Sequence, residues 1–427
     1  MKRQEKTRKT VRKTFRYIEC DAFADYLHDM SMKGWHFREW STGLVFEKGE
    51  PEDICYRVEV FPKGTEMDTV PEQDAMEYAE YCAAAGWKLI DGQKRFCIFR
   101  GISGDAVPIV TEEERLENIF RAERKALTSE FAAGSFLTFV FWKELLGSQF
   151  EDWVFSNARL LLLLFSTAVA AYRLCKIAAL YVLKFRYRKR IEAEQPVSYG
   201  RRSAARKAER IIGILALTGM LTYTCMMGTW GPLLAAAVMC IILYGVDFLL
   251  GRMRPSRKEN WVLQITGGIG SVYVMLVIAA VLLSVPVENH ETSGVPDLSL
   301  RPEDYRASSG EPVRESSDSE SSVLGSRAVM RMTYGTETEE DTDRIIYFIW
   351  RSEYPWVIER IWDIQTRGRY PSVCCEDAWD ARDAWGVGEY EKKNYYIRYD
   401  DAVFVIYGED LSEQETVDAI RQKLKLG

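Results

Sequence analysis

The strongest constraint on the fold is a series of apolar runs between residues 157 and 285, with polar sequence on both sides. A helix needs about 20 mostly apolar residues to cross a hydrocarbon layer of about 30 Å. Three runs meet this standard and predict transmembrane helices: 211–230, 232–250 and 261–285. The average composition, 47% hydrophobic and 28% charged, hides this division between polar ends and an apolar middle.

Two further spans are expected before these three. The run at 157–183 is apolar but contains Arg173 and Lys176, which are either functional intramembrane cations or, as we favour, side chains that snorkel to the headgroups where the span ends. The segment 131–150 is apolar for only about a dozen residues before Lys143 and Glu144. We expect it to span because the parity of the other helices requires one more crossing.

The basic residues orient these helices. Residues 184–210 contain ten Lys or Arg against three Glu, and 251–260 contain four against one. The positive-inside rule places both loops in the cytoplasm. The expected localisation is therefore a multi-pass protein of the bacterial cell membrane, with a cytoplasmic N-terminus and an extracytoplasmic C-terminus.

The N-terminus carries a second cluster of positive charge. A basic tail at 1–14 includes Lys2, Arg3 and five further cations, and Arg16 follows it. Nucleic-acid binding is one interpretation, but we favour attraction to an anionic leaflet, so the bilayer is the expected partner and direct nucleic-acid binding is not. No apolar core of a signal peptide occurs in the first hundred residues, so the first span is expected to direct insertion.

Residues 15–105 alternate between helical and extended patterns. The expected order is strand, helix and two strands, followed by strand, helix and two strands again. Apolar residues recur at spacings of three and four in 21–33 and, less cleanly, in 72–85. We therefore predict a cytoplasmic α+β domain with a weak internal duplication, followed by a helical connector at 106–130.

Each expected helix of this domain ends in a Gly-Trp pair, Gly34-Trp35 and Gly86-Trp87. Glycine closes a helix in the left-handed conformation at no Cβ cost, and the tryptophan then buries its ring as the next strand begins. This structural interpretation is favoured. The alternative is that the two tryptophans line a shared cleft for an apolar ligand or a partner helix.

The polar C-terminal part divides into two regions. Residues 286–325 form an acidic, Ser-rich linker that is expected to be a disordered spacer. Residues 326–427 are expected to form a small extracytoplasmic α+β domain, with helical sequence at 342–365 and a hairpin turning at Asp400-Asp401. The vicinal pair Cys374 and Cys375 is a candidate redox pair, open to a strained disulfide, a mixed disulfide or two free thiols.

The motifs of common enzyme classes are missing from the sequence. It has no P-loop, nucleophile elbow, HExxH or paired-carboxylate motif, and its three histidines are dispersed. Its nine cysteines include no CxxC. We therefore expect neither catalytic activity, nor a cofactor, nor a metal site. The predicted fold class is multi-domain, with a cytoplasmic α+β domain, an α-helical transmembrane bundle of about five spans and an extracytoplasmic α+β domain.

Several N-terminal segments resemble one bacterial family. They are "KTFRYI", "MSMKGWHF", "VFEKGEPEDICYRVEVF" and "YCAAAGWKLI" with "FCIFRG". Over about 15–105 the chain is similar to the membrane-protein family called domain of unknown function 2812, which is common in Firmicutes. Genes of this family often lie beside a regulator of the PadR transcription-factor family. The resemblance implies a link to transcriptional regulation or envelope stress and supplies no catalytic residues.

Layout and resemblance together favour a non-catalytic sensor or regulatory protein that binds a PadR-type regulator or another envelope protein. The alternative is a transporter accessory or a membrane-active protein. A change in transcription of neighbouring genes on deletion, as opposed to a change in solute accumulation alone, distinguishes the two. The sequence leaves the oligomeric state open.

Overall fold

The computed structural model of the chain forms two compact units. Unit 1 comprises residues 1–138 and 164–285, and unit 2 comprises 139–163 and 286–427. Within them the structure describes residues 7–102, 107–200, 203–227, 231–283, 299–301, 304, 314–334, 343–388, 393–409, 411 and 413–427. Parts of the expected spans, at 228–230 and 284–285, lie outside the described residues, as does most of the expected linker, at 286–298, 302–303 and 305–313.

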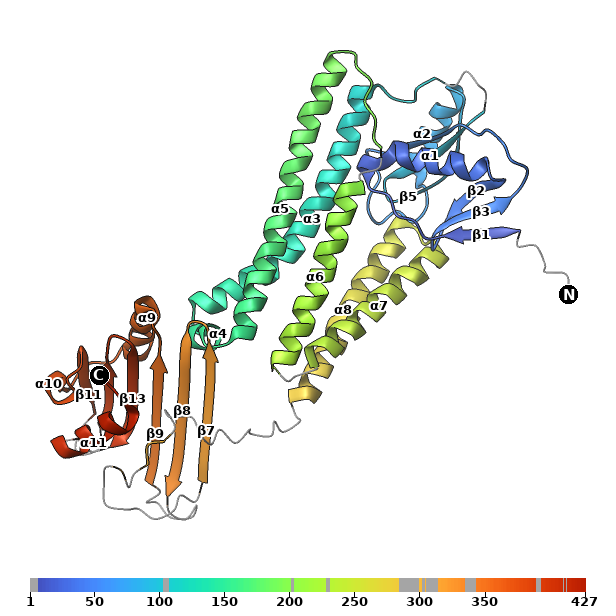
Figure 1. Ribbon diagram of the computed structural model, residues 1–427. Helices are drawn as coiled ribbons and strands as arrows, with labels where there is room; N and C mark the ends of the chain where they lie inside the picture. The colour runs from blue at the N-terminus through green and yellow to red at the C-terminus, as the bar shows by residue number, and fades with distance from the viewer. Residues whose placement is uncertain are drawn as a thin grey trace. The chain divides into compact units, whose positions relative to one another are not determined.

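Unit 1 begins with an α+β domain built from one motif used twice (Figure 1). The motif is β-α-β-β, and in both copies the first strand pairs with the last, giving the sheet orders β1-β3-β2 and β4-β6-β5. All pairings are antiparallel. The elements are β1 (Arg8–Val11), the 3-10 turn η1 (Tyr17–Glu19), α1 (Cys20–Ser31), β2 (Trp35–Trp40), β3 (Leu44–Lys48), β4 (Tyr56–Val60), α2 (Gln73–Ala84), β5 (Trp87–Gln93) and β6 (Phe96–Gly101).

The apolar spacing of the two helices explains which face each one buries. In α1, Phe23, Leu27 and Met30 lie in the core, as residues at spacings of three and four should. In α2 the buried residues are Ala75 and Cys82, while Met76 and Tyr81 are exposed. The internal order of the domain agrees with the sequence pattern. Its boundary does not, because β1 lies inside the segment expected to be a basic tail.

Five long helices make up most of the rest of the middle of the chain. They are α3 (Glu112–Leu146), α5 (Asn157–Glu192), α6 (Ser203–Met227), α7 (Gly231–Met253) and α8 (Arg257–Leu283). Helix α3 runs without a break through the expected connector and into the expected first span. Figure 1 shows α7 and α8 as neighbours within unit 1, where they pack against each other.

The prediction of a five-span transmembrane bundle is wrong. Among the described residues only α5 is long and apolar enough to cross a membrane, with a mean hydropathy of 1.7 in its most apolar window. A large part of the chain outside the helices also folds as a seven-stranded sheet. In 131–150 the charged Lys143 and Glu144 interrupt the apolar run and lower its mean hydropathy, and parts of the runs 211–230 and 261–285 lie outside the described residues.

Unit 2 is centred on an antiparallel sheet with the order β10-β11-β12-β13-β9-β8-β7. Alternate residues of β9 and β13 point to two separate cores, as the period of a strand requires. Helices α10 and α11 belong to one core, and α4 and α9 to the other. The elements are α4 (Phe150–Val154), β7 (Arg314–Ser322), β8 (Gly325–Tyr334), β9 (Asp343–Arg351), α9 (Pro355–Thr366), β10 (Val373–Cys374), α10 (Glu376–Trp379), β11 (Asp383–Val387), β12 (Lys393–Arg398), β13 (Ala402–Glu409) and α11 (Gln414–Leu424).

Two sequence interpretations of this unit need correction. The stretch "RESSDSESS", expected to be a disordered spacer, is the edge strand β7, which pairs with β8 along its whole length. The first half of the expected helix at 342–365 is the strand β9, and only the second half is helical. The hairpin of β12 and β13 turns at Asp400-Asp401 as expected.

Candidate functional site

The segment just before α1 places Arg16 against two helices of unit 1. Arg16 donates from Nε to Glu123 of α3 at 2.6 Å and from Nη1 to Glu209 of α6 at 3.0 Å. Its backbone N–H donates to Glu19 at 3.1 Å, so the 3-10 turn fixes the guanidinium from its own side. Charge-assisted bonds of this kind are the strongest hydrogen bonds available to a protein.

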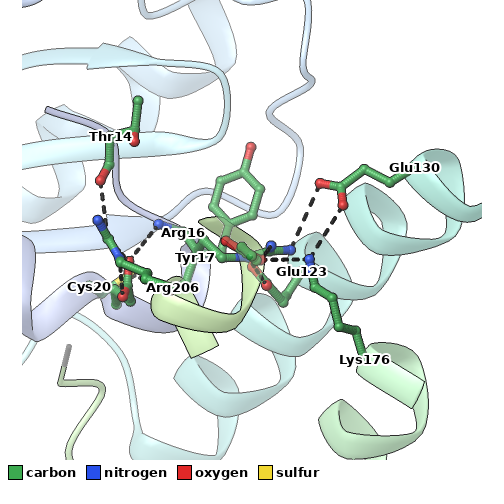
Figure 2. Close-up of polar contacts among 10 residues, drawn as sticks. Thr14, Arg16, Tyr17, Cys20, Glu123, Glu130, Lys176 and Arg206 are labelled. Atoms are coloured by element: carbon green, nitrogen blue, oxygen red, sulfur yellow. Dashed lines mark hydrogen bonds and ion pairs between the residues drawn. The ribbon is translucent and has the colours of Figure 1, made fainter. Parts of the chain in front are cut away.

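Lys176 of α5 reaches the same place from a third helix. Its Nζ lies 2.7 Å from Glu209 and 3.6 Å from Glu130 of α3. Glu130 also lies 4.0 Å from Arg16, and Figure 2 shows it facing both cations. We call these five residues the junction cluster, because two cations and three carboxylates join the α+β domain to three helices.

Burial sets the electrostatics of the junction cluster. Only 5% of the Glu123 side chain is exposed, and this burial raises its pKa despite the opposing charge of Arg16. Burial also acts on Glu209, but hydrogen bonds and charge from Lys176 and Arg16 outweigh it and lower the pKa of Glu209. The pKa values of two carboxylates in the same cluster are thus shifted in opposite directions.

A cavity of about 350 Å³ opens beside the cluster. It is lined by Thr14, Phe15, Arg16, Arg206, Glu209 and Arg210. Arg206 is held there by an ion pair to Glu19 and by a hydrogen bond to the carbonyl of Thr14 at 3.1 Å (Figure 2). Three arginines and one glutamate line the cavity, and two of these arginines, Arg16 and Arg206, have carboxylate partners.

A second buried ion pair ties α3 to the centre of the domain. Arg115, 3% exposed, lies 3.0 Å from Glu59 of β4 and 2.7 Å from Asp21 of α1. The other oxygen of Asp21 accepts from the backbone of Tyr199 at 2.8 Å. One arginine therefore connects both repeats of the domain to α3, and through Asp21 to the segment between α5 and α6.

The short turn between α7 and α8 forms the third connection. Arg254 donates to Asp91 of β5 at 2.6 Å. Arg257 forms a bidentate pair with Asp68 at 2.6 and 2.9 Å, and Asn260 donates to the carbonyl of Met67 at 2.6 Å. The domain is thus held at three places by polar contacts from α3, from α6 and the segment that precedes it, and from the α7–α8 turn with the start of α8.

This arrangement is suited to holding elements together, because its charged groups engage one another across the helices. Among the described residues no three His, Cys, Asp or Glu are grouped so as to hold a metal ion. The buried thiol of Cys20 donates to the carbonyl of Tyr17, and burial holds its pKa well above the ordinary value, so it is not a thiolate nucleophile. The carboxylates of the cluster are engaged by arginine or lysine.

The two Gly-Trp pairs occupy equivalent positions in the repeats but different cores. Gly34 and Gly86 have φ of 75° and 86°, the left-handed conformation expected at the end of a helix. Trp35 packs half-buried on the first core, and Trp87 is buried in a second one near α2. The structure therefore does not bring the two rings into one cleft.

The other candidate residues separate in a similar way. Arg173 donates to the backbone carbonyl of Glu130 at 2.9 Å, whereas Lys176 belongs to the junction cluster. Cys374 is exposed and Cys375 half-buried, and both are free thiols. Sequence reasoning singled out Lys176 as a cation in an apolar run but missed its partners, because Glu209 and Glu130 are remote in the chain and no motif connects them.

The fold and the junction define a class of protein: a duplicated β-α-β-β domain fastened by ion pairs to the ends of long helices. Residues 20–131, from the start of α1 into α3, match the family model described as "Protein of unknown function (DUF2812)". The resemblance found in the sequence is thereby confirmed for this segment, which we call the DUF2812 domain. No curated protein and no solved structure matches the chain significantly.

Proposed function

We propose that this chain is a non-catalytic, membrane-associated regulatory protein. In this proposal the helices change arrangement in response to a stimulus, and the DUF2812 domain passes the change to a protein partner. The observation that carries the proposal is the junction cluster, in which α3 and α6 bind Arg16 of the segment that leads into α1, and Lys176 of α5 binds the same carboxylate of α6. A shift of any one helix would have to break or re-form buried ion pairs, which favours discrete states.

Membrane association rests on α5. Its apolar run begins at Leu160, and the helix ends in the basic sequence "KFRYRKR" at 184–190. Basic residues beside a span favour the cytoplasmic side. The proposal therefore places the basic end of α5 in the cytoplasm, together with the DUF2812 domain whose core it packs against.

Two exposed cysteines test the compartments directly. Cys55 lies in the DUF2812 domain and Cys374 in unit 2, and both are exposed. Single-cysteine variants would be treated with a membrane-impermeant maleimide in intact and in permeabilised cells. We expect Cys55 to react only after permeabilisation, and the reaction of Cys374 in intact cells shows on which side the C-terminal sheet lies. Labelling of Cys55 in intact cells would contradict the proposal.

Regulation is tested by removing one cation of the junction cluster while its other ion pairs remain. Lys176→Gln removes one cation and leaves Glu209 its bond to Arg16. The matched control is Arg8→Gln, which breaks an exposed ion pair to Glu47 in the same domain. In a deletion strain complemented with each variant at equal protein level, Lys176→Gln should alter transcription of the neighbouring genes and Arg8→Gln should not. An effect of deletion on solute accumulation alone would favour the transport alternative.

The partner is proposed to be a PadR-type regulator or another envelope protein. Helix α2 offers a contact surface, since Met76 and Tyr81 are 52% and 74% exposed. A photo-crosslinking amino acid at position 81 should capture such a protein in living cells. The same amino acid at Asp53, on the exposed loop before β4, serves as the control.

A further inference from the structure

One end of unit 2 exposes three apolar side chains from two segments that are far apart in the sequence. Val323, in the turn between β7 and β8, is 73% exposed. Tyr354 and Trp356, where α9 begins, are 43% and 51% exposed. Side chains of this size are normally buried, so a group of them at one end of a domain calls for a partner. We call these three residues the apolar rim.

Hydrogen bonds fix the turn of the hairpin to the beginning of α5. The side chain of Asn157, the first residue of α5, accepts from the backbone N–H of Val323 at 3.0 Å. The hydroxyl of Ser322 donates to the carbonyl of Val154 at 2.6 Å. The position of Val323 is therefore set by α5 itself.

The start of α9 is fixed to the same place. Ser352 donates from its hydroxyl to the carbonyl of Leu324 at 2.6 Å, which links the segment before α9 to the hairpin turn. The ring of Trp356 lies 6.1 Å from that of Phe150 in α4, in an edge-to-face arrangement. Arg360 donates to the carbonyl of Leu146, the last residue of α3, at 2.9 Å.

From these contacts we infer that the apolar rim sits in the interfacial layer of a phospholipid bilayer, at the point where α5 enters it. The inference rests on the proposed membrane association of α5. The apolar run begins at Leu160, three residues after Asn157, which is only about 4.5 Å along the helix axis. The rim is thereby held at the depth of the headgroups, where tryptophan and tyrosine are favoured because one part of each ring system is apolar and the other polar.

The surroundings of the rim favour lipid over a second protein. A hollow of about 420 Å³ lies between the hairpin turn and the segment before α9. Its lining includes Ser321, Ser326, Glu353 and Asp401, so polar groups alternate with the apolar side chains. A dry protein interface would require these groups to lose water, whereas the headgroup layer keeps them hydrated.

The test places a fluorescent bimane label on single cysteines at positions 323 and 356. The full chain would be used, with the exposed cysteines replaced by serine, in vesicles of phosphatidylethanolamine and phosphatidylglycerol. Some of the lipid carries a doxyl quencher near the headgroup. The control is Glu315→Cys, exposed on the same strand and about 24 Å from the hairpin turn by the rise of a strand.

We expect the quencher to lower emission at 323 and 356 about twofold and to leave the label at 315 almost unchanged, because only interfacial residues meet the quencher. If the quencher leaves the emission at 323, 356 and 315 unchanged in protein that floats with the vesicles, the inference is overturned and membrane association stands. Equal quenching at 315 would also overturn it. Protein that fails to float with vesicles would defeat the proposed membrane association as well.

Discussion

Single residues show where this fold is least tolerant of change. Gly34 has a positive φ, and a Cβ built on it would lie 2.7 Å from the backbone carbonyl oxygen of Gly49. Gly368 has nearly the same φ of +73°, but nothing lies within 4 Å of its Cβ position. Comparison of these two glycines therefore separates the cost of a left-handed backbone from the cost of a steric clash.

Gly34→Ala should therefore be more destabilising than Gly368→Ala. The left-handed conformation costs an alanine about 1–2 kcal/mol at either site. At Gly34 the clash adds to this cost, because Gly49, which follows β3, is held beside Gly34 by a backbone hydrogen bond of 2.9 Å to the Gly34 carbonyl. Amide hydrogen exchange should accelerate in β2 by more than tenfold in Gly34→Ala, since each 1.4 kcal/mol corresponds to about a factor of ten. If exchange accelerates as much around Gly368 in Gly368→Ala as in β2 in Gly34→Ala, the clash at position 34 has been relieved.

Glu123 gives a pH dependence whose sign follows from its environment. Burial raises its pKa above the ordinary 4.5, so the folded state binds the proton more tightly than the unfolded chain does. Its contribution to the free energy of unfolding therefore increases as the pH falls from neutral toward 4.5 and decreases as the pH rises. Glu209 has a lowered pKa and acts in the opposite sense, but only at more acidic pH.

Comparison of the wild type with Glu123→Gln isolates this effect. Between about pH 7 and pH 5, where Glu209 stays ionised, the wild type should gain stability relative to the variant. Arg16 keeps its bond to Glu209 in the variant, so the domain should still fold. Melting temperatures of both proteins at the two pH values provide the measurement. A difference that does not change with pH would mean that Glu123 is not the group that titrates.

At the scale of elements, the turn between α7 and α8 is the connection most easily removed. Arg257 binds Asp68 with both branches of its guanidinium, and the Asp68 side chain is only 6% exposed. Loss of the arginine would leave a buried carboxylate without this partner, although Thr65 still donates to it.

Arg257→Ala should release the turn from the domain at a cost of about 1.5–3 kcal/mol, the usual contribution of a charged hydrogen-bonded pair. Arg257→Lys should recover part of this, because a lysine keeps the charge and loses the bidentate geometry. Hydrogen exchange of residues 65–69 reports the release, and Arg188→Ala, which breaks an exposed pair within α5, is the control. Equal protection in all three variants would exclude the turn as a connection.

These elements also show what could be predicted from the sequence. The repeated β-α-β-β order follows from local signals, since Gly34, Gly86 and the apolar spacing of α1 act within a few residues. The strand β7 could not be found, because "RESSDSESS" has no apolar residue and is extended only through its pairing with β8. The junction cluster was hidden for a similar reason, since Arg16 and Glu209 come together only through the fold.

At the scale of the whole molecule, two helices contribute residues to both compact units. Helix α3 crosses the boundary at residue 138 and α5 at residue 163. The stretch between them belongs to the core of unit 2, where Glu151 accepts from Trp350 at 2.9 Å and from Gln365 at 2.7 Å. The segments of the two units alternate along the chain, so neither unit is formed by one continuous segment.

The character of α5 decides how the whole molecule is located. Ala168 lies within its apolar run and is exposed in the protein alone. In water Ala168→Arg should change little, because arginine is a good helix former and the site has room. In a bilayer the same charge at the centre of a span costs about 2.5–3.5 kcal/mol. Alkaline extraction of membranes should therefore release Ala168→Arg and retain both the wild type and Ala193→Arg, a control just beyond the basic end of α5. Equal retention of all three proteins would mean that α5 does not hold the molecule in the membrane.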